Sequence, residues 1–108
     1  MLYRTLCPDD FDDAVTLYRE LSGTRPVADG EFGRDTFLQI LTRDGTTIHG
    51  AETAGRIVSM ATLHLMPNMT YGGRPYALVE NVVTLKAHQG QGIGRGVMNA
   101  LIEAAWAA

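Results

Sequence analysis

The segment that most constrains the fold is Arg56–Met66, because apolar residues occupy both of its alternating sets of positions. One set holds Ile57, Ala61, Leu63 and Leu65, and the other holds Val58, Met60 and Met66. A strand that is apolar on both faces has to be covered on both faces by other layers of the protein. We therefore expect Arg56–Met66 to be a central strand of a sheet that is flanked by helices.

The residues before this segment predict its first neighbour in the sheet. Thr46–Thr53 has the pattern of a strand, and only Ala54 and Gly55 separate it from Arg56–Met66. Two strands joined by so short a turn pair most simply as an antiparallel hairpin. The hairpin is thus the expected middle of the sheet.

The N-terminal part of the chain predicts one short strand and two helices. A strand is expected at Leu2–Leu6, and Pro8 stops it because proline cannot donate a hydrogen bond to a ladder. Apolar residues recur at helical spacing in Asp10–Ser22, and a shorter helix is predicted for Arg34–Thr42. The stretch Thr24–Gly33 holds a proline, two glycines and no periodicity, so we expect a loop there.

The C-terminal part predicts a strand, a glycine loop and a helix. Tyr76–Lys86 is rich in branched residues and is interrupted only by Glu80 and Asn81. Glycines then crowd into His88–Gly96, and helical spacing returns from Ile93 to the last residues. The predicted order is strand, helix, helix, strand, strand, strand, glycine loop, helix.

Length and composition limit the class of protein. A chain of 108 residues, 45% of them hydrophobic, supplies one core, so we expect a single domain over residues 1–108. The net charge is -3 and the nine basic residues are dispersed, which disfavours nucleic acid and membranes as partners. Cys7 is the single cysteine and the three histidines lack metal-site spacing, so we expect a cytoplasmic protein without a metal.

The glycine-rich stretch His88–Gly96 connects the last predicted strand to the last predicted helix. The first turn of any helix leaves its backbone N–H groups without partners in the helix, and the helix dipole makes that end positive. Glycines also let a phosphate approach the backbone closely. One interpretation is an anion-binding loop, and the other is a flexible connector that ends in a helix cap.

Two common phosphate-binding motifs do not fit this loop. The P-loop requires a lysine after its glycines, and none follows here. The dinucleotide motif Gly-x-Gly-x-x-Gly fails because Arg95 or Val97 stands where its third glycine belongs. The pattern that does fit is Gln/Arg-x-x-Gly-x-Gly/Ala, over Gln89–Gly94.

With this motif the sequence resembles the GNAT superfamily of N-acetyltransferases, whose members carry the pattern between the fourth strand and the third helix. The element order and the run Val79–Thr84 are similar to the same family over essentially the whole chain. The resemblance implies an α/β (α+β) fold. It further implies a mixed, mostly antiparallel sheet flanked by helices, in the order strand, helix, helix, three strands, helix.

The resemblance also implies a cofactor, acetyl-CoA, and the backbone groups that hold it. The amides expected to bind its pyrophosphate belong to Gln89, Gly90, Gln91, Gly92, Ile93, Gly94 and Arg95. The backbone of Val82, Val83 and Thr84 is expected to pair with the pantetheine arm as an added strand would. In the family an amide on this strand also polarises the thioester carbonyl.

A base is required because an ammonium group has no lone pair with which to attack a thioester. Glu80 matches a position where family members often place such a carboxylate, and the equally weighted alternative is a glutamate that only faces solvent. For Asn81 we expect a bulge that splays the strand and opens the cofactor slot. His64 is expected to be a packing residue with a satisfied polar tip, and the alternative is that it assists a proton transfer.

The sequence departs from the family at its C-terminal end. Family members continue with a fifth strand, a fourth helix and two final strands, whereas this sequence stops at Ala108. We expect those strands to be missing, together with the tyrosine that protonates the leaving thiolate in the family. Three readings follow: a fragment, a natural short form, or a protomer completed by its neighbour in a homodimer.

These observations predict an acyl-CoA-dependent N-acyltransferase that acetylates a primary amine of a small molecule or peptide by direct attack. Glu80 favours this hypothesis. The missing acid favours an alternative, a non-catalytic acyl-CoA-binding or interaction module, and a phosphate-binding scaffold unrelated to CoA is a third hypothesis. In the family the loop between the first two helices shapes the acceptor site, which here is Thr24–Gly33.

Overall fold

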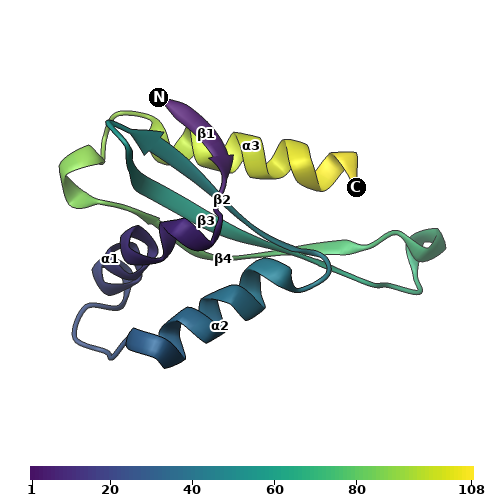
Figure 1. Cartoon of the computed structure of the whole chain (residues 1–108). Coiled ribbons are helices and arrows are strands. Elements are labelled where there is room, and N and C mark those ends of the chain that lie inside the picture. Colours follow the sequence, from purple (N-terminus) through teal and green to yellow (C-terminus); the bar gives the residue numbers. More distant parts are fainter.

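A computed structural model describes all 108 residues as one antiparallel sheet with helices on both of its faces (Figure 1). The strands and helices are β1 (Leu2–Thr5), α1 (Phe11–Ser22), α2 (Gly30–Thr42), β2 (Thr46–Thr53), β3 (Arg56–Met66), β4 (Tyr76–Thr84) and α3 (Ile93–Ala107). The predicted element order is confirmed. Short 3-10 turns at Pro8–Asp10, Tyr71–Gly73 and Lys86–His88 lead into α1, β4 and the glycine loop.

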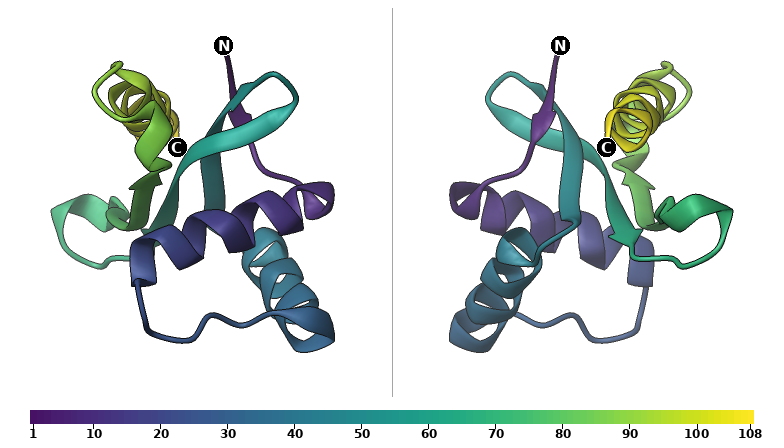
Figure 2. Two further views of the ribbon diagram at one scale, coloured as in Figure 1. Left: turned by 90° about the vertical axis from the view of Figure 1, so that its left-hand side faces the viewer. Right: turned by 90° about the vertical axis from the view of Figure 1, so that its right-hand side faces the viewer.

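The strands follow one another across the sheet in the order β1-β2-β3-β4, and every neighbouring pair is antiparallel. Figures 1 and 2 show α1 and α2 on one face of the sheet and α3 on the other. The central position predicted for β3 is confirmed, because it pairs with β2 and β4 and is covered on both faces. β4 is an edge strand.

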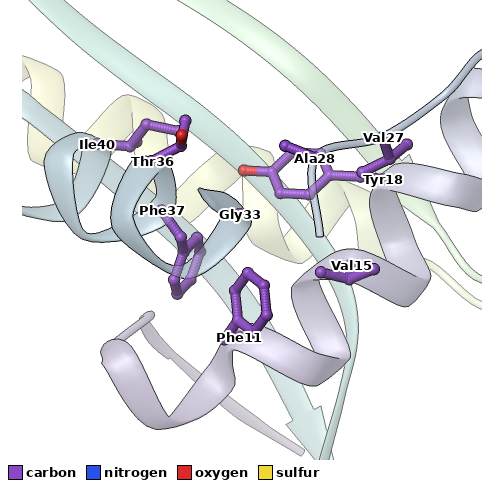
Figure 3. A pocket seen from close by; sticks show the side chains of 9 residues that line it. All are labelled: Phe11, Val15, Tyr18, Val27, Ala28, Gly33, Thr36, Phe37 and Ile40. Carbon is purple, nitrogen blue, oxygen red and sulfur yellow. The ribbon is translucent and has the colours of Figure 1, made fainter. Parts of the chain in front are cut away.

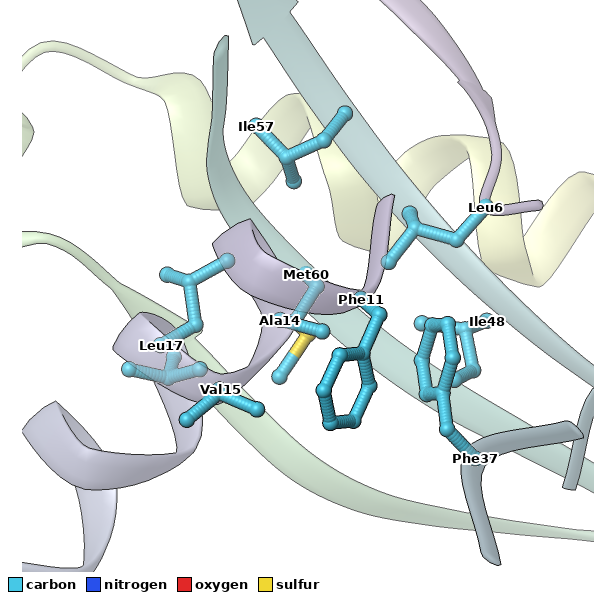
Figure 4. Close-up of a cluster of buried hydrophobic side chains, with 10 residues drawn as sticks. Leu6, Phe11, Ala14, Val15, Leu17, Phe37, Ile48, Ile57 and Met60 are labelled. Atoms are coloured by element: carbon cyan, nitrogen blue, oxygen red, sulfur yellow. The ribbon is translucent and has the colours of Figure 1, made fainter. Parts of the chain in front are cut away.

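Two clusters of buried side chains hold these layers together. The first lies between the sheet and helices α1 and α2 and consists of Leu6, Phe11, Ala14, Val15, Leu17, Phe37, Ile48, Ile57, Met60 and Val83 (Figure 4). The second lies under α3 and consists of Ala51, Val58, Ala61, Leu63, Ile93, Val97 and Leu101. Removal of this apolar area from water is the main favourable contribution to folding.

The side-chain alternation of β3 breaks at its start, which corrects one prediction. Ile57 was expected on the face of Ala61 and Leu63, yet it packs in the first cluster, and Val58 takes its place in the second. The cause is a register shift in the β2–β3 pair, which leaves Val58 as an extra residue. Asp13 of α1 then accepts a hydrogen bond from the Ile57 amide at 3.0 Å.

Helix α2 begins at Gly30, four residues before the predicted start. The glycines of Thr24–Gly33 suggested a loop, but Gly33 lies inside the helix. Glycine is needed there because the chain packs too closely for a side chain. A Cβ on Gly33 would lie 2.8 Å from the backbone of Ala28. The loop between α1 and α2 is therefore shorter than predicted.

A cluster of charged side chains joins β1 to the start of α1. The Arg4 guanidinium donates to both oxygens of Asp10, at 2.8 and 2.9 Å, and also to Glu52 of β2. The Cys7 amide donates to Asp10 at 2.8 Å. The hydrogen bonds from Arg4 hold the pKa of the buried Asp10 carboxyl below its usual range.

Replacement of this carboxylate should destabilise the fold. We expect Asp10→Asn to lower the free energy of unfolding by about 2 kcal/mol at neutral pH, because charge-assisted hydrogen bonds to Arg4 are lost. Since the folded-state pKa is depressed, this stabilisation exists above the ordinary aspartate pKa of about 3.9 and disappears as the pH falls through the folded-state value. The deficit should therefore shrink in acid.

Urea unfolding at several pH values measures this effect. Asp9→Asn is the matched control, because the neighbouring Asp9 is exposed and forms no ion pair. An equal loss of stability in both variants would contradict the role given to Asp10.

Candidate functional site

The glycine loop presents six successive backbone N–H groups that have no partner in the protein. The first N–H of this region to donate within the chain is that of Gly96, which bonds to the Gly92 carbonyl at 3.0 Å. The free amides are those of Gly90, Gln91, Gly92, Ile93, Gly94 and Arg95. Gly90 and Gly92 have φ angles of +76° and +79°, a conformation that glycine adopts without strain.

The charges at this end of α3 favour an anion. The first turn of the helix contains no acidic residue, and Arg95 lies in it. A cation there opposes the positive end of the helix dipole, so it disfavours the helix unless an anion binds nearby. The amides and Arg95 together therefore offer the unpaired donors and the positive charge that an anion-binding site needs.

β4 contains the bulge expected at Asn81. Met60 pairs with Val83 and Thr62 pairs with Glu80, so two residues of β4 lie opposite Ala61 alone. Asn81 has a φ angle of +52°, one of three positive values among residues other than glycine. The bulge bends the edge strand where Val82 is exposed and the chain turns toward the glycine loop.

A cleft of about 430 Å³ lies beside this bulge. It brings together four predicted cofactor residues, Val82, Val83, Thr84 and Gln89. Glu20 and Leu21 at the end of α1, and Lys86, line the same cleft and were missed by the sequence analysis. No local sequence motif marks Glu20 and Leu21, because they reach the cleft only through the packing of α1 against β4.

Several side chains near the cleft fix the backbone. The Gln89 side-chain amide donates to the Thr84 carbonyl at 3.0 Å, and the Thr84 hydroxyl lies 2.8 Å from that of Ser59. The backbone N–H of Gln89, which was expected to bind the pyrophosphate, instead donates to the Lys86 carbonyl at 3.3 Å. The Lys86 amide donates to Glu20 at 3.0 Å, and the Ile93 side chain is buried in the second core cluster. These contacts hold the strand and loop in place, so the backbone amides of Gly90–Arg95 remain the groups open to a ligand.

Glu80 lies on the face of the sheet that α1 and α2 cover. It pairs with Thr62, which pairs with Ile48 of the first core cluster, and side chains of directly paired residues share a face. Its side chain is 51% exposed. Glu80 therefore lies on this face at the sheet edge and presents its carboxylate to solvent.

His64 is the polar neighbour of this carboxylate. Its Nε2 atom lies 3.8 Å from a carboxylate oxygen of Glu80, and its Nδ1 atom lies 2.9 Å from the hydroxyl of the buried Thr46. Three adjacent strands thus contribute one polar row. His64 was expected to be a packing residue with a satisfied polar tip, and its two ring nitrogens lie near Thr46 on one side and Glu80 on the other.

The structure contains neither a group of metal ligands nor a helix that could span a membrane. No three His, Cys, Asp or Glu side chains come together in a way that could hold a metal ion. None of the helices combines the length and the apolar character needed to cross a bilayer.

The sequence of this chain matches a known protein family. The Acetyltransferase (GNAT) family profile matches residues 14–108. The chain belongs to the GNAT acetyltransferase family. The resemblance stated from the glycine motif and the element order is thereby confirmed.

Solved structures and one curated relative support the membership. A putative acetyltransferase from Agrobacterium tumefaciens superposes with a TM-score of 0.95 and is 37% identical, over 99% of this chain and 74% of its own. A glucosamine 6-phosphate N-acetyltransferase of Trypanosoma brucei brucei is 27% identical over 93% of this chain and 68% of its own length.

A more distant GNAT structure bears on the cofactor. A predicted acetyltransferase from Clostridium acetobutylicum, solved with acetyl-CoA, has a TM-score of 0.76 and 22% identity, over 97% of this chain and 73% of its own. At that identity the likeness concerns the fold. The chain therefore shares its fold with a protein that was solved with acetyl-CoA.

The bulge of this GNAT strand can be tested by substitution. Asn81→Val should lower the free energy of unfolding by about 1–2 kcal/mol, because a β-branched residue is strained at positive φ. Asn81→Gly should be tolerated, since glycine adopts that conformation freely. Thermal unfolding of the two variants measures the difference, and equal stability would mean that residue 81 does not have a positive φ in solution.

Proposed function

We propose that the chain is an N-acetyltransferase that transfers an acetyl group from acetyl-CoA to a primary amine by direct attack. The observation that carries the proposal is the row of six free amides at the start of α3, next to the cleft at the β4 bulge. Such a row is suited to the two phosphates of a pyrophosphate. Family membership makes acetyl-CoA the ligand expected there.

The residues present fit this cofactor. The amides of Gly90–Arg95 and the Arg95 side chain would hold the pyrophosphate, and the cleft lined by Val82 and Thr84 would receive the pantetheine arm. β4 is an edge strand, so half of its backbone groups face away from β3 and are free to pair. When bound, acetyl-CoA supplies an acetyl thioester as the electrophile.

Glu80 is the proposed base. Its carboxylate is close enough to the bulge to take a proton, directly or through water, from an amine held near Val82. His64, 3.8 Å away, restricts where the carboxylate lies and is held in turn by Thr46. A backbone N–H of the bulged segment is the proposed donor that polarises the thioester carbonyl.

Cofactor binding is the first test. Isothermal titration of acetyl-CoA into the purified chain should give saturable binding that is lost in Gly92→Val, because a branched side chain would block the amides. Gly55→Val is the matched control: Gly92 and Gly55 have φ angles of +79° and +76° with no atom within 4 Å of an added Cβ, and Gly55 lies in the β2–β3 turn and does not line the cleft. Weak binding in both variants would point to general destabilisation.

Catalysis is tested at Glu80. Glu80→Gln should reduce acetyl transfer to a primary amine by about 10²–10⁴-fold while acetyl-CoA still binds, because the amide cannot accept the proton. Glu103→Gln, an exposed change on α3, is the control. Release of CoA thiol measures the rate. Binding of acetyl-CoA without turnover by the unmodified chain would favour the alternative, a non-catalytic acyl-CoA-binding module.

A further inference from the structure

A second hollow lies between α1 and α2, apart from the cofactor cleft. Its volume is about 190 Å³. The residues that line it are all uncharged: Phe11, Val15, Tyr18, Val27, Ala28, Gly33, Thr36, Phe37 and Ile40 (Figure 3). An engineered apolar cavity of about 150 Å³ binds benzene, so this hollow has room for an aromatic ring with a small substituent.

One polar atom in this hollow has no partner. The Tyr18 hydroxyl is buried and forms no hydrogen bond within the protein. Figure 3 shows its ring reaching across from α1, with the oxygen directed toward Thr36 and Ile40 of α2. The Thr36 hydroxyl is already bonded to the Phe32 carbonyl at 2.9 Å. A buried hydroxyl without a partner is unfavourable, and a ligand atom that accepts or donates a hydrogen bond would remove that cost.

The hollow adjoins the proposed acyl-transfer site along α1. Tyr18 lines the hollow and Leu21 lines the cofactor cleft. Residues three apart on a helix are neighbours on its surface, separated by about 5–6 Å between Cβ atoms. Glu80 lies on the same face of the sheet that these helices cover. A molecule seated in the hollow could therefore extend its amine toward the bulge.

Two of the cations near the hollow are already paired, and a third, Arg25 in the loop before Val27, does not line it. Arg19 donates to Asp29 at 3.0 Å. Arg34 lies 4.7 Å above the Phe11 ring and 3.6 Å from Asp12. A phosphate group would find neither a free cation nor a charged residue among the side chains that line the hollow.

We propose that this hollow binds the acceptor, and that the acceptor is an arylalkylamine whose ring carries one neutral polar substituent for Tyr18. The inference rests on the proposed function and gives it a substrate class. An aromatic ring fits the volume of the hollow, and the apolar lining residues suit its surface. The unpaired Tyr18 hydroxyl can form a hydrogen bond with the polar substituent. The phosphorylated amino sugar in the name of the Trypanosoma relative lacks a binding partner in this hollow.

Four amines separate the possibilities in the acetyl-transfer assay: tyramine, phenethylamine, ethanolamine and glucosamine 6-phosphate. We expect kcat/KM for tyramine to exceed that for ethanolamine by at least about 10- to 200-fold, the discrimination that apolar pockets commonly reach. Tyr18→Phe should raise KM about two- to tenfold for tyramine and leave KM for phenethylamine unchanged, because only tyramine has the hydroxyl that the lost group bonded.

A second variant tests the volume of the hollow. Ala28→Trp, from an exposed position at its edge, should raise KM for both aromatic amines more than it raises KM for ethanolamine. Gln39→Trp is the control, since Gln39 is exposed on α2 and does not line the hollow. Equal effects of Tyr18→Phe on tyramine and phenethylamine, or turnover of ethanolamine or glucosamine 6-phosphate without preference for the aromatic amines, would overturn the proposal while leaving acetyl transfer intact.

Binding can also be followed without catalysis. Addition of 4-methylphenol, which has the ring and hydroxyl but no amine, should shift the backbone amide NMR signals of residues 27–40. The absence of such shifts at millimolar concentrations would overturn the hollow as a ligand site. Shifts confined to these residues in a chain that acetylates no amine would support the ring-binding hollow and overturn the proposed function instead.

Discussion

One extra residue in β4 determines both the packing and the chemistry of this sheet edge. In a regular strand, residues three apart face opposite sides, yet Glu80 and Val83 lie on the same face. The bulge opposite Ala61 makes this possible. It lets Val83 enter the core beneath α1 while Glu80 keeps its carboxylate on that side of the sheet, next to His64. The core and the proposed base therefore depend on a single local irregularity.

The amides of the glycine loop are fixed by the helix that follows them. Ile93, Val97 and Leu101 anchor α3 in the second core cluster. A side chain at Gly96 would overlap the Tyr3 ring of β1, so glycine there lets this ring pack directly against α3. The first turn of the helix is thus held in place by packing, and a ligand that meets its free N–H groups has little backbone to order.

Local patterns in the sequence were enough for the strands, the element order and the loop. The period of two in Thr46–Thr53 and the strand–glycine–helix sequence around Gly92 are set by neighbours along the chain. The predictions failed where packing between residues that are not neighbours along the chain determines the structure. Gly33 was predicted to be a loop residue, but it lies in α2 and packs against the backbone of Ala28. Neither Glu20 nor the Tyr18 hollow is marked by a local sequence motif, because the packing of helices creates both sites.

Helix α1 connects the two halves of the proposed reaction. Tyr18 reaches into the apolar hollow, and two residues later Glu20 holds the Lys86 amide just before the glycine loop. Asp13, nearer the start of the helix, bonds Ile57 at the bulge of β3 and ties α1 to the sheet. A rigid helix fixed at both ends keeps the hollow and the cofactor cleft at a constant separation. Because acyl transfer depends on holding two reactants in register, this separation would contribute to the rate of the proposed transfer even though α1 supplies no reacting group.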